Sequence, residues 1–102
     1  MSENWKNAKE LISYSKGGIT SKTIFKTKAM DAALFCMWKG TELSEHTSAR
    51  EGLVIVLEGK GIFTLKGKKI LMRPETIIHM EKNARHSLEA EENTAFLLVL
   101  FK

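Results

Sequence analysis

The sequence predicts an all-β protein, either a sandwich or a closed barrel, on three observations. Short segments rich in β-branched and other apolar residues recur along most of the chain. Glycine, proline or asparagine turn signals separate these segments at intervals of about eight to twelve residues. After Gly18 the chain reads as strands throughout, and no internal repeat indicates a solenoid.

The chain begins with a segment of a different kind. Residues 4–13 carry apolar side chains at roughly helical spacing, which predicts a short helix or an irregular lead-in. The run Lys16-Gly17-Gly18 ends it. The segments that follow share the composition of strands and are bounded by turn-forming residues. The predicted strands are 19–26, 32–38, 53–57, 62–65, 69–72, 76–80, 86–90 and 94–101.

Three of these predictions follow from local detail. The run LVIVL at 53–57 is the most apolar, so this strand should be buried on both faces or nearly so. Residues 62–65 and 69–72 flank Lys66-Gly67-Lys68, which predicts a tight hairpin with glycine at positive φ. Asn83 lies in the loop 81–85, where asparagine tolerates the left-handed conformation.

Length and composition predict one domain over residues 1–102, with a lead-in at 1–18 and a barrel core at about 30–102. Apolar residues at 43% and charged residues at 27% exclude a disordered chain. No stretch approaches the roughly 20 apolar residues of a membrane span, and the start MSENWKNAKE lacks the apolar core of a signal peptide. We therefore expect a cytoplasmic protein without a membrane partner.

The net charge of +4 does not predict nucleic-acid binding. Its densest basic stretch, from Lys60 to Arg73, coincides with the predicted hairpin, where lysines commonly keep an edge strand soluble. The single cysteine, Cys36, excludes an internal disulfide. It lies in an apolar run, which favours a buried thiol over a catalytic thiolate.

From Gly40 onward the sequence resembles the small single-domain cupins. Gly40 is followed by five residues, then by His46-Thr47-Ser48, and the segment closes at Gly59. A second segment opens at Arg73-Pro74-Glu75 and closes at His86. The resemblance implies the cupin jelly-roll barrel, a double-stranded β-helix, here preceded by the short helix or irregular segment. A barrel of this kind hosts many unrelated activities, so the fold alone does not imply a function.

The resemblance also implies a site, which this sequence fills only in part. Metal-binding cupins present three histidines and a glutamate inside the barrel, and His46 and His86 stand at the first and last histidine positions. Ser48 replaces the second histidine, and Gly52 stands at the glutamate position. Glu51 is a candidate third ligand if Gly52 allows a bulge that turns its carboxylate inward. Such a site would take a divalent transition metal: zinc, manganese, iron or nickel.

Three functions remain open on these residues. The preferred one is a small cupin that binds a small polar or anionic ligand through His46, Ser48 and His86, with weak or no metal binding. The second is a metal-dependent enzyme, an isomerase or dioxygenase, that uses His46, His86 and Glu51. In the third, a structural or interaction module, both histidines are ordinary barrel residues. The catalytic residues of any reaction are not specified by the sequence.

Other residues receive less specific interpretations. His79 is expected to be structural or to face the surface. Met37 and Met80 are expected to fill core gaps rather than to form a copper(I) site with the histidines. The apolar runs at 32–38 and 95–101, together with 53–57, exceed what one small barrel interior needs. We therefore predict a homodimer that buries the surplus.

Overall fold

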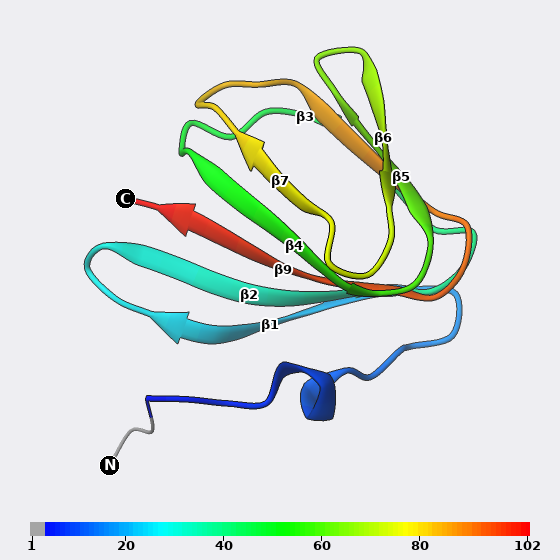
Figure 1. Cartoon of the computed structure of the whole chain (residues 1–102), viewed down its shortest axis with the longest axis horizontal. Coiled ribbons are helices and arrows are strands. Elements are labelled where there is room, and N and C mark those ends of the chain that lie inside the picture. Colours follow the sequence, from blue (N-terminus) through cyan, green and yellow to red (C-terminus); the bar gives the residue numbers. More distant parts are fainter. Residues whose placement is uncertain (1–3) are drawn as a thin grey trace.

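The computed structural model describes residues 4–102, in which nine strands form two antiparallel sheets (Figure 1). One sheet has the strand order β1-β2-β9-β4-β7 and the other has the order β3-β8-β5-β6. The strands are β1 (Ile19–Lys26), β2 (Met30–Met37), β3 (Glu42–His46), β4 (Gly52–Glu58), β5 (Gly61–Leu65), β6 (Lys68–Met72), β7 (Ile77–Met80), β8 (His86–Ala90) and β9 (Thr94–Phe101). The predicted all-β jelly roll is confirmed.

The lead-in contains one turn of 3-10 helix, η1 (Ala8–Leu11), where a short helix or an irregular segment was expected. Residues 1–3 of the predicted lead-in lie outside the described residues. Leu11, Ile12 and Tyr14 pack against Leu34 and Cys36 on the outer face of the five-stranded sheet. Cys36 is 1% exposed, which confirms the prediction of a buried thiol.

A hydrogen bond fixes this covering segment to the sheet. The Tyr14 hydroxyl donates to Glu58 Oε2 at 2.7 Å, and both side chains are partly buried. Burial raises the pKa of Tyr14, and the hydrogen bond to the Glu58 carboxylate raises it further. The phenol therefore stays protonated and acts as a donor at neutral pH.

The core lies between the two sheets, and strand alternation explains which side chains enter it. On β4, Val54 and Val56 are 1% exposed and point inward, while Leu53, Ile55 and Leu57 are half-buried on the outer face. The prediction that 53–57 is buried on both faces or nearly so holds for the inner face, while the outer face is half-buried. The buried core cluster comprises Met37, Val54, Val56, Phe63, Met72, Ile78, Met80, Leu88, Ala90 and Phe96.

Turn residues take the conformations that their types favour. Strands β5 and β6 are joined by Lys66 and Gly67, both at positive φ (51° and 82°), as a type I′ hairpin turn requires. Asn83 has a φ of 64° and is left-handed, as its place in the loop predicts. The hairpin and loop predictions are thus confirmed.

Strand β3 was not among the predicted strands. Its sequence, Glu-Leu-Ser-Glu-His, has a single apolar residue, and four of its five residues are exposed. It forms because its backbone pairs with β8 at the edge of the four-stranded sheet. Pairing of this kind leaves little trace in hydrophobic patterning.

The outer face of the five-stranded sheet carries an apolar patch that the lead-in leaves uncovered. Ile77 of β7 pairs with Ile55 of β4, which in turn pairs with Leu97 of β9, so their side chains share this face. Ile77 is 66% exposed, and Phe101 at the end of β9 is 38% exposed. The predicted homodimer stays a prediction. Within residues 4–102, no helix is long and apolar enough to cross a membrane.

Candidate functional site

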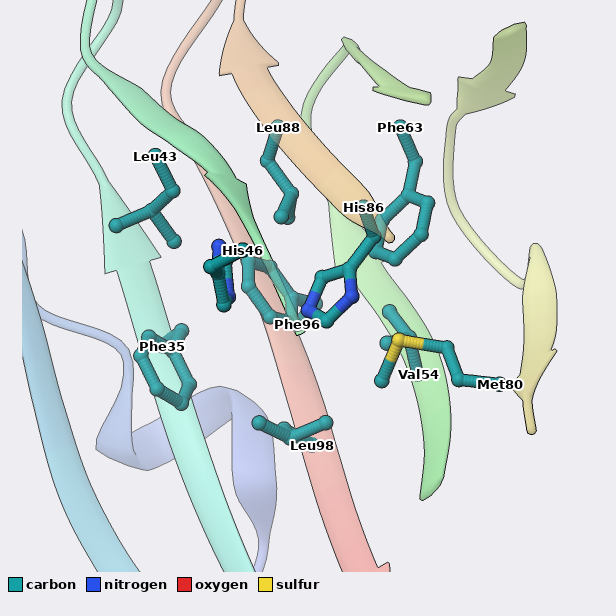
Figure 2. Close-up of a pocket in the computed structure, with 10 residues that line it drawn as sticks. All are labelled: Phe35, Leu43, His46, Val54, Phe63, Met80, His86, Leu88, Phe96 and Leu98. Carbon is teal, nitrogen blue, oxygen red and sulfur yellow. The ribbon is translucent and has the colours of Figure 1, made fainter. Parts of the chain in front are cut away.

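A pocket of about 160 Å³ opens between the two sheets (Figure 2). Both sheets contribute to it, and two of its side chains are histidines while the others are apolar. Its lining residues are Phe35, Leu43, His46, Val54, Phe63, Met80, His86, Leu88, Phe96 and Leu98. A small, mainly apolar concave site with a few fixed polar groups is the usual form of a small-molecule site.

The fold brings His46 and His86 together across forty residues of sequence. They are direct cross-strand partners on β3 and β8, and their ring centroids lie 4.1 Å apart with the planes at 60°. Both rings project into the pocket (Figure 2).

A bulge in β3 decides which way His46 points. Leu43 pairs with Leu88 and His46 with His86, so three steps along β3 match two steps along β8. In a regular strand, residues three apart lie on opposite faces. The extra residue in β3 restores the inward direction, so Leu43 and His46 both line the pocket.

The two histidines occupy different depths. His86 is 6% exposed, whereas His46 is exposed and lies at the mouth beside the half-buried Phe35 and Leu43. A ligand that reached His86 would therefore pass His46.

Backbone carbonyls set the protonation pattern of both rings. His46 Nδ1 lies 2.7 Å from the carbonyl oxygen of Ser44, and His86 Nδ1 lies 3.0 Å from that of Ala84. A carbonyl only accepts, so each Nδ1 carries a proton and donates it. In the neutral rings Nε2 is consequently an unprotonated acceptor. Each of these pocket-lining histidines therefore keeps a lone pair at Nε2 that can accept a hydrogen bond, take up a proton or bind a metal ion.

Burial keeps His86 in the neutral form. It lowers the pKa of His86, and the nearby His46 lowers it too, while the hydrogen bond to the Ala84 carbonyl opposes the shift. At neutral pH the His86 ring is uncharged and can act as a base.

Aromatic rings form walls on both sides of the pocket. Phe35 and Phe96 from the five-stranded sheet stack with centroids 5.2 Å apart. Phe63 lies parallel to His86 at 5.7 Å in the opposite sheet. Sequence reasoning foresaw an apolar cavity but missed these particular residues. Strand alternation within each apolar run was the available signal, but it does not say which face is inward.

Two residues assigned to the site by sequence lie elsewhere. Ser48 is in the loop between β3 and β4, where its Oγ accepts from Arg50 N at 3.1 Å, and it is not among the lining residues. Glu51 is exposed, and its carboxylate pairs with His79 Nε2 at 2.5 Å. The expectations that Ser48 contacts a ligand and that Glu51 turns into the pocket are therefore corrected: both side chains are engaged outside it.

The glutamate position of the family motif is closed by neighbouring side chains. A Cβ at Gly52 would lie 2.9 Å from Leu100 Cδ2 and 3.3 Å from Met80 Cε. Those apolar groups occupy the space that an inward carboxylate would need. A side chain at this position would therefore have to displace Leu100 and Met80. The bulge that would have brought Glu51 inward is not formed, because Gly52 pairs regularly with Met80 and Leu100.

The donor set does not fit a firmly held transition metal. Such sites generally use three or more protein ligands, and within residues 4–102 no group of three or more histidine, cysteine, aspartate or glutamate side chains is placed to hold an ion. The two imidazoles provide a pair of suitable nitrogens, and no cysteine, carboxylate or further histidine within residues 4–102 joins them as a third ligand. Met37 and Met80 both belong to the buried core cluster, as expected of residues that fill core gaps, and Met80 also lines the pocket.

His79 was expected to be structural or to face the surface, and it is exposed on β7, outside the pocket. Its pairing with Leu53 in the adjacent strand places it on the outer face of the sheet. It therefore serves as a natural control for the two pocket histidines.

Comparison with known proteins identifies the family of this fold. The cupin domain model matches residues 33–101, so the chain belongs to the cupin family. A cupin 2 conserved barrel domain protein from Leptotrichia buccalis is 32% identical, with a TM-score of 0.85, over 92% of this chain and 46% of that chain. A conserved protein of unknown function from Streptococcus pyogenes is 22% identical, with a TM-score of 0.87, over 100% of this chain and 90% of that one.

Relatives described as enzymes are more distant. A predicted oxalate decarboxylase from Thermotoga maritima is 19% identical over 81% of this chain and 79% of that chain, with a TM-score of 0.75. At this identity the likeness shows the fold alone. A comparison with curated proteins found no match.

Proposed function

We propose that this cupin binds a small polar or anionic molecule between the two sheets, in the cytoplasm and with weak or no metal binding. One observation carries the proposal: two imidazoles whose ring centroids lie 4.1 Å apart line an otherwise apolar cavity, and the use of both Nδ1 protons by backbone carbonyls leaves the Nε2 atoms as acceptors. His86 Nε2 has no hydrogen-bond partner in the described part of the protein and is not a buried unpaired atom, so it is accessible from the pocket and can accept a hydrogen bond from a ligand. His46 at the mouth supplies the second contact.

The test is a binding experiment with three probes of different chemistry: phenol, acetamide and acetate. Each is titrated into the protein while amide and histidine ring signals are followed by NMR. We expect saturable binding of at least one probe that is lost in His46→Ala and in His86→Ala. His79→Ala, which removes an imidazole outside the pocket, should leave it unchanged. If binding is absent, or survives both pocket variants, the structural or interaction module is the better interpretation.

A metal-dependent enzyme is the second candidate, because both Nε2 atoms are free to coordinate an ion. Elemental analysis of protein purified without chelator decides between the two. Stoichiometric zinc, manganese, iron or nickel that disappears in His46→Ala would favour the enzyme. Its absence in both wild type and variant is the result expected from the two-nitrogen donor set.

A further inference from the structure

The polar groups that line the pocket accept hydrogen bonds and carry no fixed charge. Each Nδ1 proton is already donated to a backbone carbonyl, so the Nε2 atoms of His46 and His86 are acceptors. Within the described part of the chain, the other eight lining residues are apolar, so no lysine or arginine lines the pocket. With both imidazoles neutral, a buried carboxylate or phosphate would lose its water and meet acceptors only. The lining therefore favours a neutral molecule that brings its own hydrogen-bond donor.

The size of the pocket limits that molecule to about one ring. The volume is about 160 Å³, close to the ~150 Å³ of an engineered apolar cavity that takes up benzene. A six-membered ring with one or two small substituents fits this space. A fused or linked pair of rings does not.

The walls suit a planar ring. Phe35 and Phe96 stack on one side, and Phe63 lies parallel to His86 on the other (Figure 2). Aromatic rings attract one another in offset and edge-to-face arrangements, in addition to the gain from apolar burial. An aromatic ligand would make such contacts with both sheets.

We infer that the pocket takes a neutral phenol, a single aromatic ring whose hydroxyl donates to Nε2 of His86. This inference rests on the proposed function and specifies its ligand class. The ring lies between the two aromatic walls, and the hydroxyl meets the buried imidazole at the inner end. A second hydroxyl on the adjacent carbon, as in catechol, would donate to Nε2 of His46, whose ring lies 4.1 Å from that of His86.

The experiment compares phenol, toluene and benzoate, three single rings of similar size that differ in the substituent. Titrations are monitored by NMR at pH 8, above the ordinary pKa of imidazole. A hydrogen bond from a neutral donor is worth about a tenfold gain in affinity. We expect phenol to bind about tenfold more tightly than toluene, and benzoate to bind more weakly than either. This comparison uses the wild-type protein and so does not depend on the folding of a variant.

A matched pair of variants assigns the difference to one ring. His86→Phe removes the acceptor but keeps an aromatic ring beside Phe63, and it should bring phenol down to the affinity of toluene. His79→Phe makes the same change on the outer face, where His79 is exposed, and should leave the phenol preference intact.

The outcomes separate this inference from the proposed function. Tighter binding of benzoate than of phenol, lost in His86→Phe, would overturn the phenol assignment and retain a histidine-dependent site. Equal binding of phenol and toluene, unchanged in His86→Phe, would overturn both. If no ring compound binds while acetamide or acetate binds in a His86-dependent way, only the phenol assignment fails.

Discussion

Gly59 closes the first family motif, and its replacement by alanine is the most direct test of the packing at the turn between β4 and β5. The residue has a φ of +102°, and a Cβ there would lie 2.3 Å from the Asn93 carbonyl oxygen and 2.5 Å from Thr94 Cα. Both contacts involve backbone atoms, which cannot rotate away. Relief requires that β4 or β9 shift at the point where the five-stranded sheet turns into the four-stranded one.

The expected cost has two parts. A left-handed conformation costs a residue with a Cβ about 1–2 kcal/mol, and overpacking in a close-packed region costs about 1–3 kcal/mol. Gly59→Ala should therefore lower the free energy of unfolding by roughly 2–5 kcal/mol. For a domain of this length, this corresponds to a fall in Tm of about 10 °C or more.

Gly67→Ala is the matched control. Gly67 also has positive φ, +82°, but a Cβ there would meet nothing within 4 Å. This variant keeps the conformational part and lacks the steric part, so it should cost only about 1–2 kcal/mol. Urea denaturation followed by circular dichroism measures both values. Equal losses in the two variants would show that the steric argument at Gly59 is wrong.

Three further predictions concern the pH response, the lead-in and the assembly. Because the folded-state pKa of His86 is depressed below its ordinary value of about 6.5, the unfolded chain binds more protons between the two values. The free energy of unfolding should therefore fall as the pH drops below about 6.5, and it should stop responding to this group below the folded-state pKa. Denaturation at several pH values should show a shallower fall in the His86→Gln variant. An unchanged slope in that variant would contradict the assignment to His86. Tyr14→Phe removes the hydroxyl that donates to Glu58 at 2.7 Å, and it should lower the free energy of unfolding, measured by urea denaturation, by about 1–2 kcal/mol. Full wild-type stability in this variant would mean that the hydrogen bond does not hold the lead-in. Sedimentation velocity should show a homodimer of twice 11.5 kDa. The Ile77→Glu variant should dissociate it, because the Ile77 side chain is 66% exposed in the apolar patch. An 11.5 kDa species at every wild-type concentration would refute the dimer.

Much of the fold could be predicted because its signals are local. Apolar runs such as 53–57 mark strands through composition, and Lys66-Gly67 and Asn83 mark turns through the backbone conformations that these residue types accept. Strand β3 escaped prediction since its pairing depends on backbone groups, and its one apolar residue, Leu43, gives no pattern.

The residues of the candidate site likewise include some that the sequence predicts and some that it does not. The motif spacing singled out His46 and His86, and the structure places both in one pocket. Motif spacing failed for Ser48 and Glu51. Spacing cannot show that the Ser48 hydroxyl accepts from a loop amide or that the Glu51 carboxylate pairs with His79. It also could not show that the space beside Gly52 is filled by distant residues.

The sequence by itself determined the all-β class, the turns, the family resemblance and the pair of histidines, because each depends on residue type or on short-range spacing. Only the tertiary structure decided where the side chains point. One extra residue in β3 turns His46 inward, and the carbonyls of Ser44 and Ala84 leave both Nε2 atoms as acceptors. Leu100 and Met80 close the position of the missing carboxylate. These features depend on register between strands far apart in the chain, and register is set by the packing of the whole barrel.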